Sequence, residues 1–322
     1  MHIETERLIL RNFRESDLDD LQAILGDAET MRNMEPPYTI EKTREFLLDF
    51  CIGQKKAFAA ERISTGQMIG YVLFKPCGEP DVYEIAWIFR RDHWRQGYAY
   101  ECCSALIRYA FTEMNVHKIF AEAIDGVKSV GLMKKLGMQL EGIHRSETRD
   151  LDGSWADLYF YGILRKEYLR SHMQLLTGTP ADIEPWMALV TRVRENFPGL
   201  ETSEALEDHR QTVLRFMAEN RALCVKICGK IAGVMLISRK HNMICCLAAA
   251  PEFRRLSIAD MLLTEALAQL DPTCEISVTT FREEDPLGTA PRALYRKHGF
   301  LPDELTIDNN YPTQRFVLPA KV

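Results

Sequence analysis

The sequence lacks the features that would place it in several specialised classes of protein. Among its 322 residues no apolar run approaches the roughly 20 residues needed to span a bilayer, which argues against a membrane protein. It has no basic surplus, because its formal net charge is −6, which argues against a general nucleic-acid binder. The charged start, residues 1–7, leads directly into a strand-like stretch and predicts no signal peptide.

Cysteine spacing typical of metal sites is also missing. The nine cysteines form no CxxC pair, and histidine does not cluster with them. The adjacent pairs Cys102-Cys103 and Cys245-Cys246 lie in apolar segments, so buried thiols acting as small apolar side chains are the favoured interpretation. Reduced thiols are typical of the cytoplasm, which is the compartment we expect, and we expect no metal.

What the sequence does contain is enough material for two domains. Its 46% hydrophobic and 27% charged residues suit a globular chain. One order of predicted elements occurs twice: strand, two helices, hairpin, apolar strand, loop, helix, strand, short helix and closing strands. A break at residues 168–179 separates the copies, and we expect domains at 1–170 and 171–322, each large enough for its own core.

Hydrophobic periodicity predicts the individual elements of each copy. In the first copy it predicts strands at 8–11, 57–61, 68–74, 83–89, 118–123 and 157–164, and helices at 17–25, 39–50, 99–111 and 129–136. In the second copy it predicts strands at 174–176, 223–227, 231–238, 244–250, 276–280 and 314–318, and helices at 183–196, 204–220, 258–270 and 291–298.

The loop after the apolar strand 83–89 is the most informative segment. A helix N-terminus leaves about four backbone N–H groups unpaired and has a positive partial charge. Gly97 lets the backbone approach a ligand closely, and Arg95 adds charge. Together these features form a pyrophosphate cradle, although a glycine before a helix can also be a simple turn.

Several motifs of the first copy, in the right order, resemble the Gcn5-related N-acetyltransferase (GNAT) family. Residues 1 to about 168 are similar to the branch that includes the ribosomal-protein alanine N-acetyltransferases. The motifs that carry this resemblance are 4–11 (ETERLILR), 94–101 (WRQGYAYE), 135–138 (KLGM), Glu141-Gly142 and Asp157.

Residues 174–322 resemble GNAT enzymes more generally. Residues 254–259 (RRLSIA) fit the family loop except that Ser257 replaces its first glycine, and 294–300 (LYRKHGF) matches the Tyr-x-x-x-Gly-Phe element. Gly288 and Pro291 replace residues that the family usually has before this helix. The resemblance implies an α/β (α+β) fold of two tandem GNAT domains, each with a mixed, largely antiparallel central sheet flanked by helices.

The resemblance also implies a mechanism, in which acetyl-CoA sits between two splayed strands and an amine attacks its thioester directly. The pantetheine strand would be Trp87, Ile88 and Phe89 in the first copy and Leu247, Ala248 and Ala249 in the second. The phosphate loops would be Arg95, Gln96, Gly97, Tyr98, Ala99 and Tyr100, and Arg254, Arg255, Leu256, Ser257, Ile258 and Ala259. A carboxylate takes the amine proton, a tyrosine hydroxyl often protonates the leaving thiolate, and a backbone N–H polarises the carbonyl.

Three residues are candidates for the chemistry, each with a structural alternative. Tyr295 matches the family's catalytic acid or packs at the edge of the core, and Glu84 is a base or a solvent-facing charge. Ser129 donates to CoA or caps its helix. Met133 stands where many members have the tyrosine, and Gly126 replaces the asparagine that precedes the serine in the alanine acetyltransferase branch.

The sequence therefore predicts an acetyl-CoA-dependent N-acetyltransferase acting on a primary amine of a small molecule or a protein N-terminus. Two alternatives stay open. In the first, one domain is a non-catalytic docking module, and the domain that contains Ser257 is the better candidate for it. In the second, the protein acetylates an aminoglycoside antibiotic. Whether Ser257 needs a positive φ, and whether Arg254-Arg255 clamps a phosphate, also stay open. The acceptor segments expected at 26–56 and 196–222 carry no motif that names the amine, and no motif indicates an oligomeric state.

Overall fold

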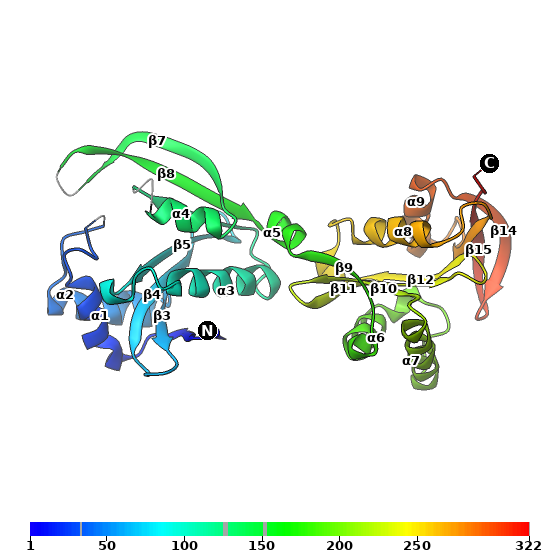
Figure 1. Ribbon diagram of the computed structural model, residues 1–322, viewed down its shortest axis with the longest axis horizontal. Coiled ribbons are helices and arrows are strands. Elements are labelled where there is room, and N and C mark those ends of the chain that lie inside the picture. The colour runs from blue at the N-terminus through cyan, green and yellow to red at the C-terminus, as the bar shows by residue number, and fades with distance from the viewer. Residues whose placement is uncertain (33, 125–127, 151–152, 322) are drawn as a thin grey trace. The chain divides into compact units, whose positions relative to one another are not determined.

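A computed structural model describes residues 1–32, 34–124, 128–150 and 153–321. The chain forms two compact units, Met1–Tyr168 and Leu169–Val322, called here the N-terminal and the C-terminal unit (Figure 1). The boundary falls within α5 (Arg165–Ser171), a helix that the periodicity did not predict. Along the described part of the chain, every helix is too short or too polar to pass through a bilayer.

The N-terminal unit is built on a sheet with the strand order β1-β2-β3-β4-β5-β6-β8-β7. Neighbouring strands in its described residues run antiparallel, except β5 and β6, which are parallel. The strands are β1 (His2–Glu4), β2 (Leu8–Asn12), β3 (Ala57–Arg62), β4 (Met68–Pro76), β5 (Val82–Phe89), β6 (Lys118–Ala123), β7 (Gln139–Arg149) and β8 (Trp155–Leu164).

Helices cover this sheet. They are η1 (Glu15–Asp17), α1 (Leu18–Leu25), α2 (Ile40–Glu45), the π-helix η2 (Phe46–Gly53), η3 (Arg91–His93), α3 (Tyr98–Thr112) and α4 (Lys128–Lys135). One core cluster joins α1 and η2 to the sheet, and it includes Leu21, Ile24, Leu47, Tyr71 and Ile88. Because Tyr71 and Ile88 are register partners on β4 and β5, this cluster fixes which face of these strands meets α1.

The C-terminal unit repeats the arrangement with the strand order β9-β10-β11-β12-β13-β15-β14, in which β12 and β13 are the parallel pair. Figure 1 shows α6 and α7 on one side of this sheet and α8 and α9 on the other. The strands are β9 (Met173–Thr177), β10 (Ala222–Ile227), β11 (Lys230–Ser238), β12 (Met243–Ala249), β13 (Ile276–Phe281), β14 (Leu301–Asp308) and β15 (Tyr311–Leu318). The helices are η4 (Pro180–Asp182), α6 (Ile183–Arg192), η5 (Arg194–Asn196), α7 (Ser203–Ala218), η6 (Pro251–Phe253), α8 (Ile258–Gln269), η7 (Pro286–Gly288) and α9 (Thr289–Lys297).

The predicted fold class is confirmed, because each unit has a mixed, mostly antiparallel sheet with flanking helices. The interpretation of the cysteines is correct for Cys102 and Cys103, which are fully buried in α3. It is wrong for Cys245, which is exposed. Cys245 lies on β12 just past Ile244, the last residue of β12 that pairs with β13, so that part of the strand has a neighbour on one edge only.

Candidate functional site

The parallel strands β5 and β6 separate soon after they pair. Their register ends at Glu84 and Phe120, and within the described residues the rest of β5 pairs with β4 alone. The backbone N–H and C=O groups of 85–89 on that edge therefore have no strand partner, and such groups need a ligand or water when covered. A groove of about 1020 Å³ opens along this edge.

The loop that leads into α3 closes one end of this groove. Arg95 and Gly97 both adopt positive φ, 59° and 86°, and Gly97 is the N-cap residue of α3. The helix therefore begins with its unpaired N–H groups at the groove. This arrangement suits an anion, since the dipole and the free donors act in the same direction.

Contacts around the loop hold its shape before any ligand arrives. Arg7 donates to the Gln96 carbonyl oxygen at 3.1 Å and pairs with Glu101 of α3 at 2.7 Å. The Trp94 indole Nε1 donates to the Phe89 carbonyl oxygen at 2.7 Å. Carbonyl oxygens of the strand end and the loop are thereby engaged by side chains, which leaves the N–H groups of the loop to face a ligand.

Glu101 is the centre of this support. Its carboxylate accepts from the Thr5 hydroxyl at 2.6 Å and from the Arg7 backbone N–H at 2.8 Å. Burial alone would raise the pKa of Glu101, but the bonds from Thr5 and Arg7 outweigh it and lower the pKa below its ordinary value of 4.5. The first-strand motif 4–11 therefore braces the loop, a role that sequence reasoning did not assign.

Most of the predicted donor-binding residues of the N-terminal unit meet in this groove. Its lining includes Trp87, Ile88, Phe89, Arg95, Gly97, Tyr98, Ala99 and Tyr100. Gln96 is not among them, since its carbonyl is held by Arg7 and its side-chain amide donates to the Asp92 carbonyl oxygen at 3.0 Å.

The predicted catalytic residues of this unit are placed differently from one another. Ser129 lines the groove and is the second residue of α4, inside the helix rather than at its N-cap. Glu84 is not among the lining residues and pairs with Lys75 at 2.9 Å. Met133 is buried, and Gly126 lies outside the described residues.

Glu122 is a lining residue that sequence reasoning missed. It lies on β6 two residues beyond the last pair with β5, so it faces the opening between the strands. Burial, followed by the nearby Glu84 carboxylate, raises the pKa of Glu122 above its ordinary value of 4.5. A carboxylate whose pKa is raised in this way accepts a proton more readily at neutral pH.

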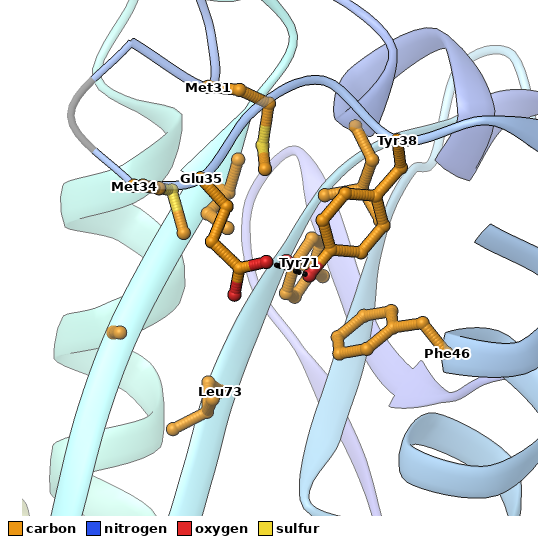
Figure 2. A pocket seen from close by; sticks show the side chains of 10 residues that line it. Met31, Met34, Glu35, Tyr38, Phe46, Tyr71 and Leu73 are labelled. Carbon is orange, nitrogen blue, oxygen red and sulfur yellow. Dashed lines mark hydrogen bonds between the residues drawn. The ribbon is translucent and has the colours of Figure 1, made fainter. Parts of the chain in front are cut away.

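Figure 2 shows the residues that line a second, smaller cavity of about 160 Å³. Met34, Ala86 and Ile88 line both this cavity and the groove, so the two spaces share a wall that includes part of β5. Its remaining lining residues are Leu25, Met31, Glu35, Tyr38, Phe46, Tyr71 and Leu73.

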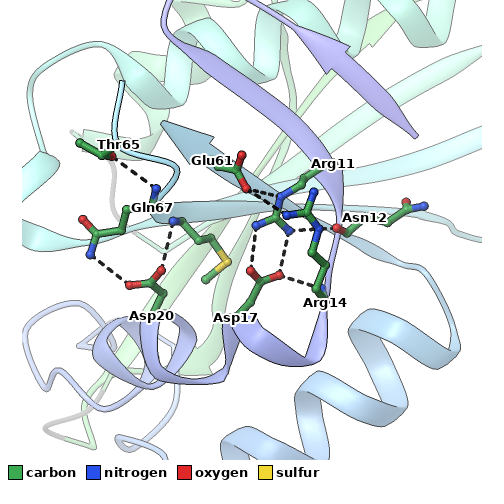
Figure 3. Close-up of polar contacts among 9 residues, drawn as sticks. Arg11, Asn12, Arg14, Asp17, Asp20, Glu61, Thr65 and Gln67 are labelled. Carbon is green, nitrogen blue, oxygen red and sulfur yellow. Dashed lines mark hydrogen bonds and ion pairs between the residues drawn. The ribbon is translucent and has the colours of Figure 1, made fainter. Parts of the chain in front are cut away.

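A buried ion-pair network anchors α1, which carries Leu25 in the wall of this cavity. Arg11 of β2 makes two 2.8 Å bonds to Asp17 and one of 2.5 Å to Glu61 of β3 (Figure 3). The side chains of Arg11 and Asp17 are 7% and 6% exposed. Because such a pair is costly to break once buried, it fixes the start of α1 against the sheet.

The C-terminal unit has a loop of the same backbone shape. Arg255 and Ser257 adopt positive φ of 62° and 64°, at the positions equivalent to Arg95 and Gly97. Ser257 is the N-cap residue of α8, so the question left open by the sequence is answered in favour of positive φ. Arg254 and Arg255 are exposed, whereas Leu256 and Ile258 are buried and Ala259 is half-buried.

The splayed strand is repeated as well, because β12 pairs with β13 only at Met243 and Ile244. The predicted residues Leu247, Ala248 and Ala249 lie beyond that point and pair with β11. Tyr295 of α9 is 4% exposed, and burial raises its pKa well above the ordinary value. Its ring lies 5.7 Å from that of Phe300, so Tyr295 packs against a neighbouring ring.

Comparisons with known proteins bear on both units. Residues 7–139 match the model of the acetyltransferase (GNAT) domain, and residues 186–300 match the model of the acetyltransferase (GNAT) family. The uncharacterized N-acetyltransferase YnaD of Bacillus subtilis (strain 168) is 31% identical over 175 residues, which cover 52% of this chain and 99% of the relative.

Solved structures of similar fold include a GNAT-family acetyltransferase from Bacillus anthracis, with a TM-score of 0.49 and 30% identity over 52% of this chain and 100% of that chain. A ribosomal-protein-S5-alanine acetyltransferase from Vibrio fischeri has a TM-score of 0.45 and 18% identity over 51% of this chain and 97% of that chain.

Proposed function

Since the chain belongs to the acetyltransferase (GNAT) family, with two such domains in tandem, we propose that its N-terminal unit transfers an acetyl group from acetyl-CoA to a primary amine. One observation carries the proposal: the free edge of β5, the positive-φ loop and the N-terminus of α3 line a single groove. Its volume, about 1020 Å³, is at the upper end of the range of ligand pockets and suits an extended donor.

Each part of the groove would hold a different part of the donor. The N–H groups at the start of α3, with Arg95, would bind the pyrophosphate. The backbone of 85–88 would pair with the amides of the pantetheine arm, as a neighbouring strand would. The thioester would then lie where β5 and β6 separate, between Ala86 and Glu122.

The chain's own contribution to the chemistry is to position the amine and remove its proton. The amine nitrogen forms a bond to the acetyl carbonyl carbon, and the carbon–sulfur bond breaks. The amine proton passes to Glu122, directly or through a water molecule, and the CoA thiolate takes a proton from solvent. Glu122 suits this role because it lines the groove and its raised pKa makes it a better base than an ordinary glutamate.

Substitutions in the two loops, made in the full chain, test the donor site. Gly97→Glu puts a carboxylate in the proposed cradle, and Ser257→Glu is the matched change in the C-terminal unit. In calorimetric titration with acetyl-CoA, we expect Gly97→Glu to weaken binding at least about tenfold, since a like charge there costs more than about 1.4 kcal/mol. Unchanged acetyl-CoA binding in a folded Gly97→Glu protein would refute the site.

Glu122→Gln tests the proposed base, and Glu84→Gln, on the neighbouring strand, tests the base expected from the sequence. We expect Glu122→Gln to lower kcat at neutral pH by about 10²–10⁴-fold. The wild-type rate should fall as the pH drops through the pKa of Glu122, which lies above 4.5, and the variant should lose this acid limb. A large loss in Glu84→Gln alone would instead support the base expected from the sequence.

A further inference from the structure

We propose that the amine accepted by the N-terminal unit is a small primary amine bearing one apolar group about the size of a benzene ring. This inference rests on the proposed transferase function and adds the chemical class of the acceptor. The acceptor's apolar group would occupy the smaller cavity (Figure 2), and its nitrogen would lie beside Ala86 and Ile88, which line both spaces.

The size of the smaller cavity limits what can enter it. Its volume is about 160 Å³, and an apolar protein cavity of roughly 150 Å³ binds benzene. One wall is aromatic: the ring of Phe46 lies 6.1 Å from that of Tyr38 and 6.1 Å from that of Tyr71. Ring pairs at these distances pack tightly, and they favour a flat or compact apolar guest.

The position of the cavity connects it to the proposed chemistry. Ala86 and Ile88 line both the cavity and the groove, and Ala86 is two residues beyond the last β5 pair with β6. A group buried against Leu73 would therefore bring an attached amine to the place where the donor strand becomes free. Proximity of this kind is what a direct transfer between two bound substrates requires.

Glu35 supplies a carboxylate to this otherwise mostly apolar lining. Its Oε2 accepts from the Tyr38 hydroxyl at 3.1 Å and from Lys42 Nζ at 2.9 Å, and its side chain is 55% exposed. The bond from Lys42 lowers the pKa of Glu35, so it is ionised at neutral pH. Lys42 balances the charge of Glu35, but the second carboxylate oxygen can still accept a hydrogen bond from one ammonium group before that group loses its proton.

The charges around the cavity favour an acceptor with one positive charge. Glu35 is paired with Lys42, and Glu84 on the same face of β5 as Ala86 is paired with Lys75 at 2.9 Å. A polyamine or an aminoglycoside gains affinity from several carboxylates that have no cation beside them. Lys42, beside Glu35, would repel the additional charges of such a molecule, so a polycation fits the smaller cavity poorly.

The first experiment compares amines as acceptors for the full chain. The thiol released from acetyl-CoA is followed with benzylamine, ethanolamine, spermidine, an aminoglycoside and a short peptide with a free N-terminus, and mass spectrometry identifies the product. We expect kcat/KM for benzylamine to exceed that for each of the others by at least about tenfold, because only benzylamine fills the cavity. Higher kcat/KM for spermidine, the aminoglycoside or the peptide would overturn the inference while leaving the transferase function intact.

Substitutions at Leu73 locate the effect, because Leu73 lines the cavity but is not among the lining residues of the groove. Leu73→Phe fills the space and should lower kcat/KM for benzylamine about tenfold, with acetyl-CoA affinity unchanged. Leu73→Ala enlarges it and should favour naphthylmethylamine over benzylamine relative to the wild type.

If both variants keep the wild-type amine preference, the cavity does not hold the acceptor and the inference fails. Should Leu73→Phe not fold, Leu73→Ala alone decides the question. Absence of acetyl-CoA binding by the wild-type chain would instead refute the proposed function itself.

Discussion

Exchanging Gly97 and Ser257 tests whether the two loops are held in the same shape despite their different residues. Ser257 has φ 64° and ψ 25°, in the left-handed region where an L-residue is disfavoured by about 1–2 kcal/mol. Among the described residues, its hydroxyl makes no capping hydrogen bond to α8 that a substitution would remove. Glycine removes this strain, but its greater conformational freedom in the unfolded chain costs about 0.5–1 kcal/mol of stability. We expect Ser257→Gly to stabilise the C-terminal unit by roughly 0.5–1 kcal/mol.

The reverse substitution should have the opposite sign in the N-terminal unit. Gly97 has φ 86° and ψ 0°, and an added Cβ would lie 3.4 Å from Arg7 Nη2, an ordinary contact. Backbone strain is therefore the main cost, and Gly97→Ser should destabilise this unit by roughly 0.5–1 kcal/mol.

Urea unfolding of the full chain, labelled with 5-fluorotryptophan and followed by fluorine NMR, separates the two units. Trp186 is the tryptophan of the C-terminal unit, and Trp87, Trp94 and Trp155 report on the other. With a slope of about 1–3 kcal/mol per molar urea, each substitution should move its own midpoint by roughly 0.2–1 M, upward for Ser257→Gly. A lower Trp186 midpoint in Ser257→Gly would refute the argument that Ser257 is strained.

Two further predictions concern polar and steric contacts. Glu101→Gln should destabilise the N-terminal unit at pH 7 by about 1–3 kcal/mol, because it removes charged hydrogen bonds to α3. The pKa of Glu101 is lowered in the folded protein, so this stability is fully present above pH 4.5 and is lost as the pH falls through the folded pKa. The thermal midpoints of the variant and the wild type should therefore converge in acid. Gly288→Ala should destabilise the C-terminal unit by about 1–3 kcal/mol, because the added Cβ would lie 1.8 Å from Arg292 Nη1, and Arg292 is held by the carbonyls of the preceding loop. Gly131→Ala, where a Cβ meets no described atom within 4 Å, is the control and should not lower the thermal midpoint of its unit.

Strong periodicity made most of the fold predictable. The apolar run of β5 and the amphipathic pattern of α3 were each located to within about two residues, because burial on a fixed period leaves a clear signal. β14 was missed, since its sequence begins with Leu301, Pro302 and Asp303, which are poor signals for a strand. It forms because it pairs with β15, a contact that local sequence does not report.

The groove was more predictable than the smaller cavity for a physical reason. A phosphate loop is one continuous segment, so residues 95–100 could be identified together. The cavity is assembled from Leu25 of α1, from residues within 31–32 and 34–38, from η2 and from two strands. Its only carboxylate among the described lining residues is Glu35. Glu122 was likewise one charge in a strand, and its raised pKa depends on burial and then on Glu84 of the neighbouring strand.

The two loops also show that glycine is not what sets their shape. Positive φ occurs at both the first and the third position in each loop, although Arg95 and Arg255 are not glycine and Ser257 replaces one. The surrounding strand end and helix therefore impose the backbone path, and the side chains adapt to it.

Any functional difference between the units should then arise from groups beside the loop. At the middle position the Gln96 carbonyl is held by Arg7 and its side chain is exposed, whereas Leu256 is buried in its own unit. Because Gln96 is exposed and Leu256 is buried, the two loops have different surroundings at this position, and we expect the affinity for acetyl-CoA to differ between the units.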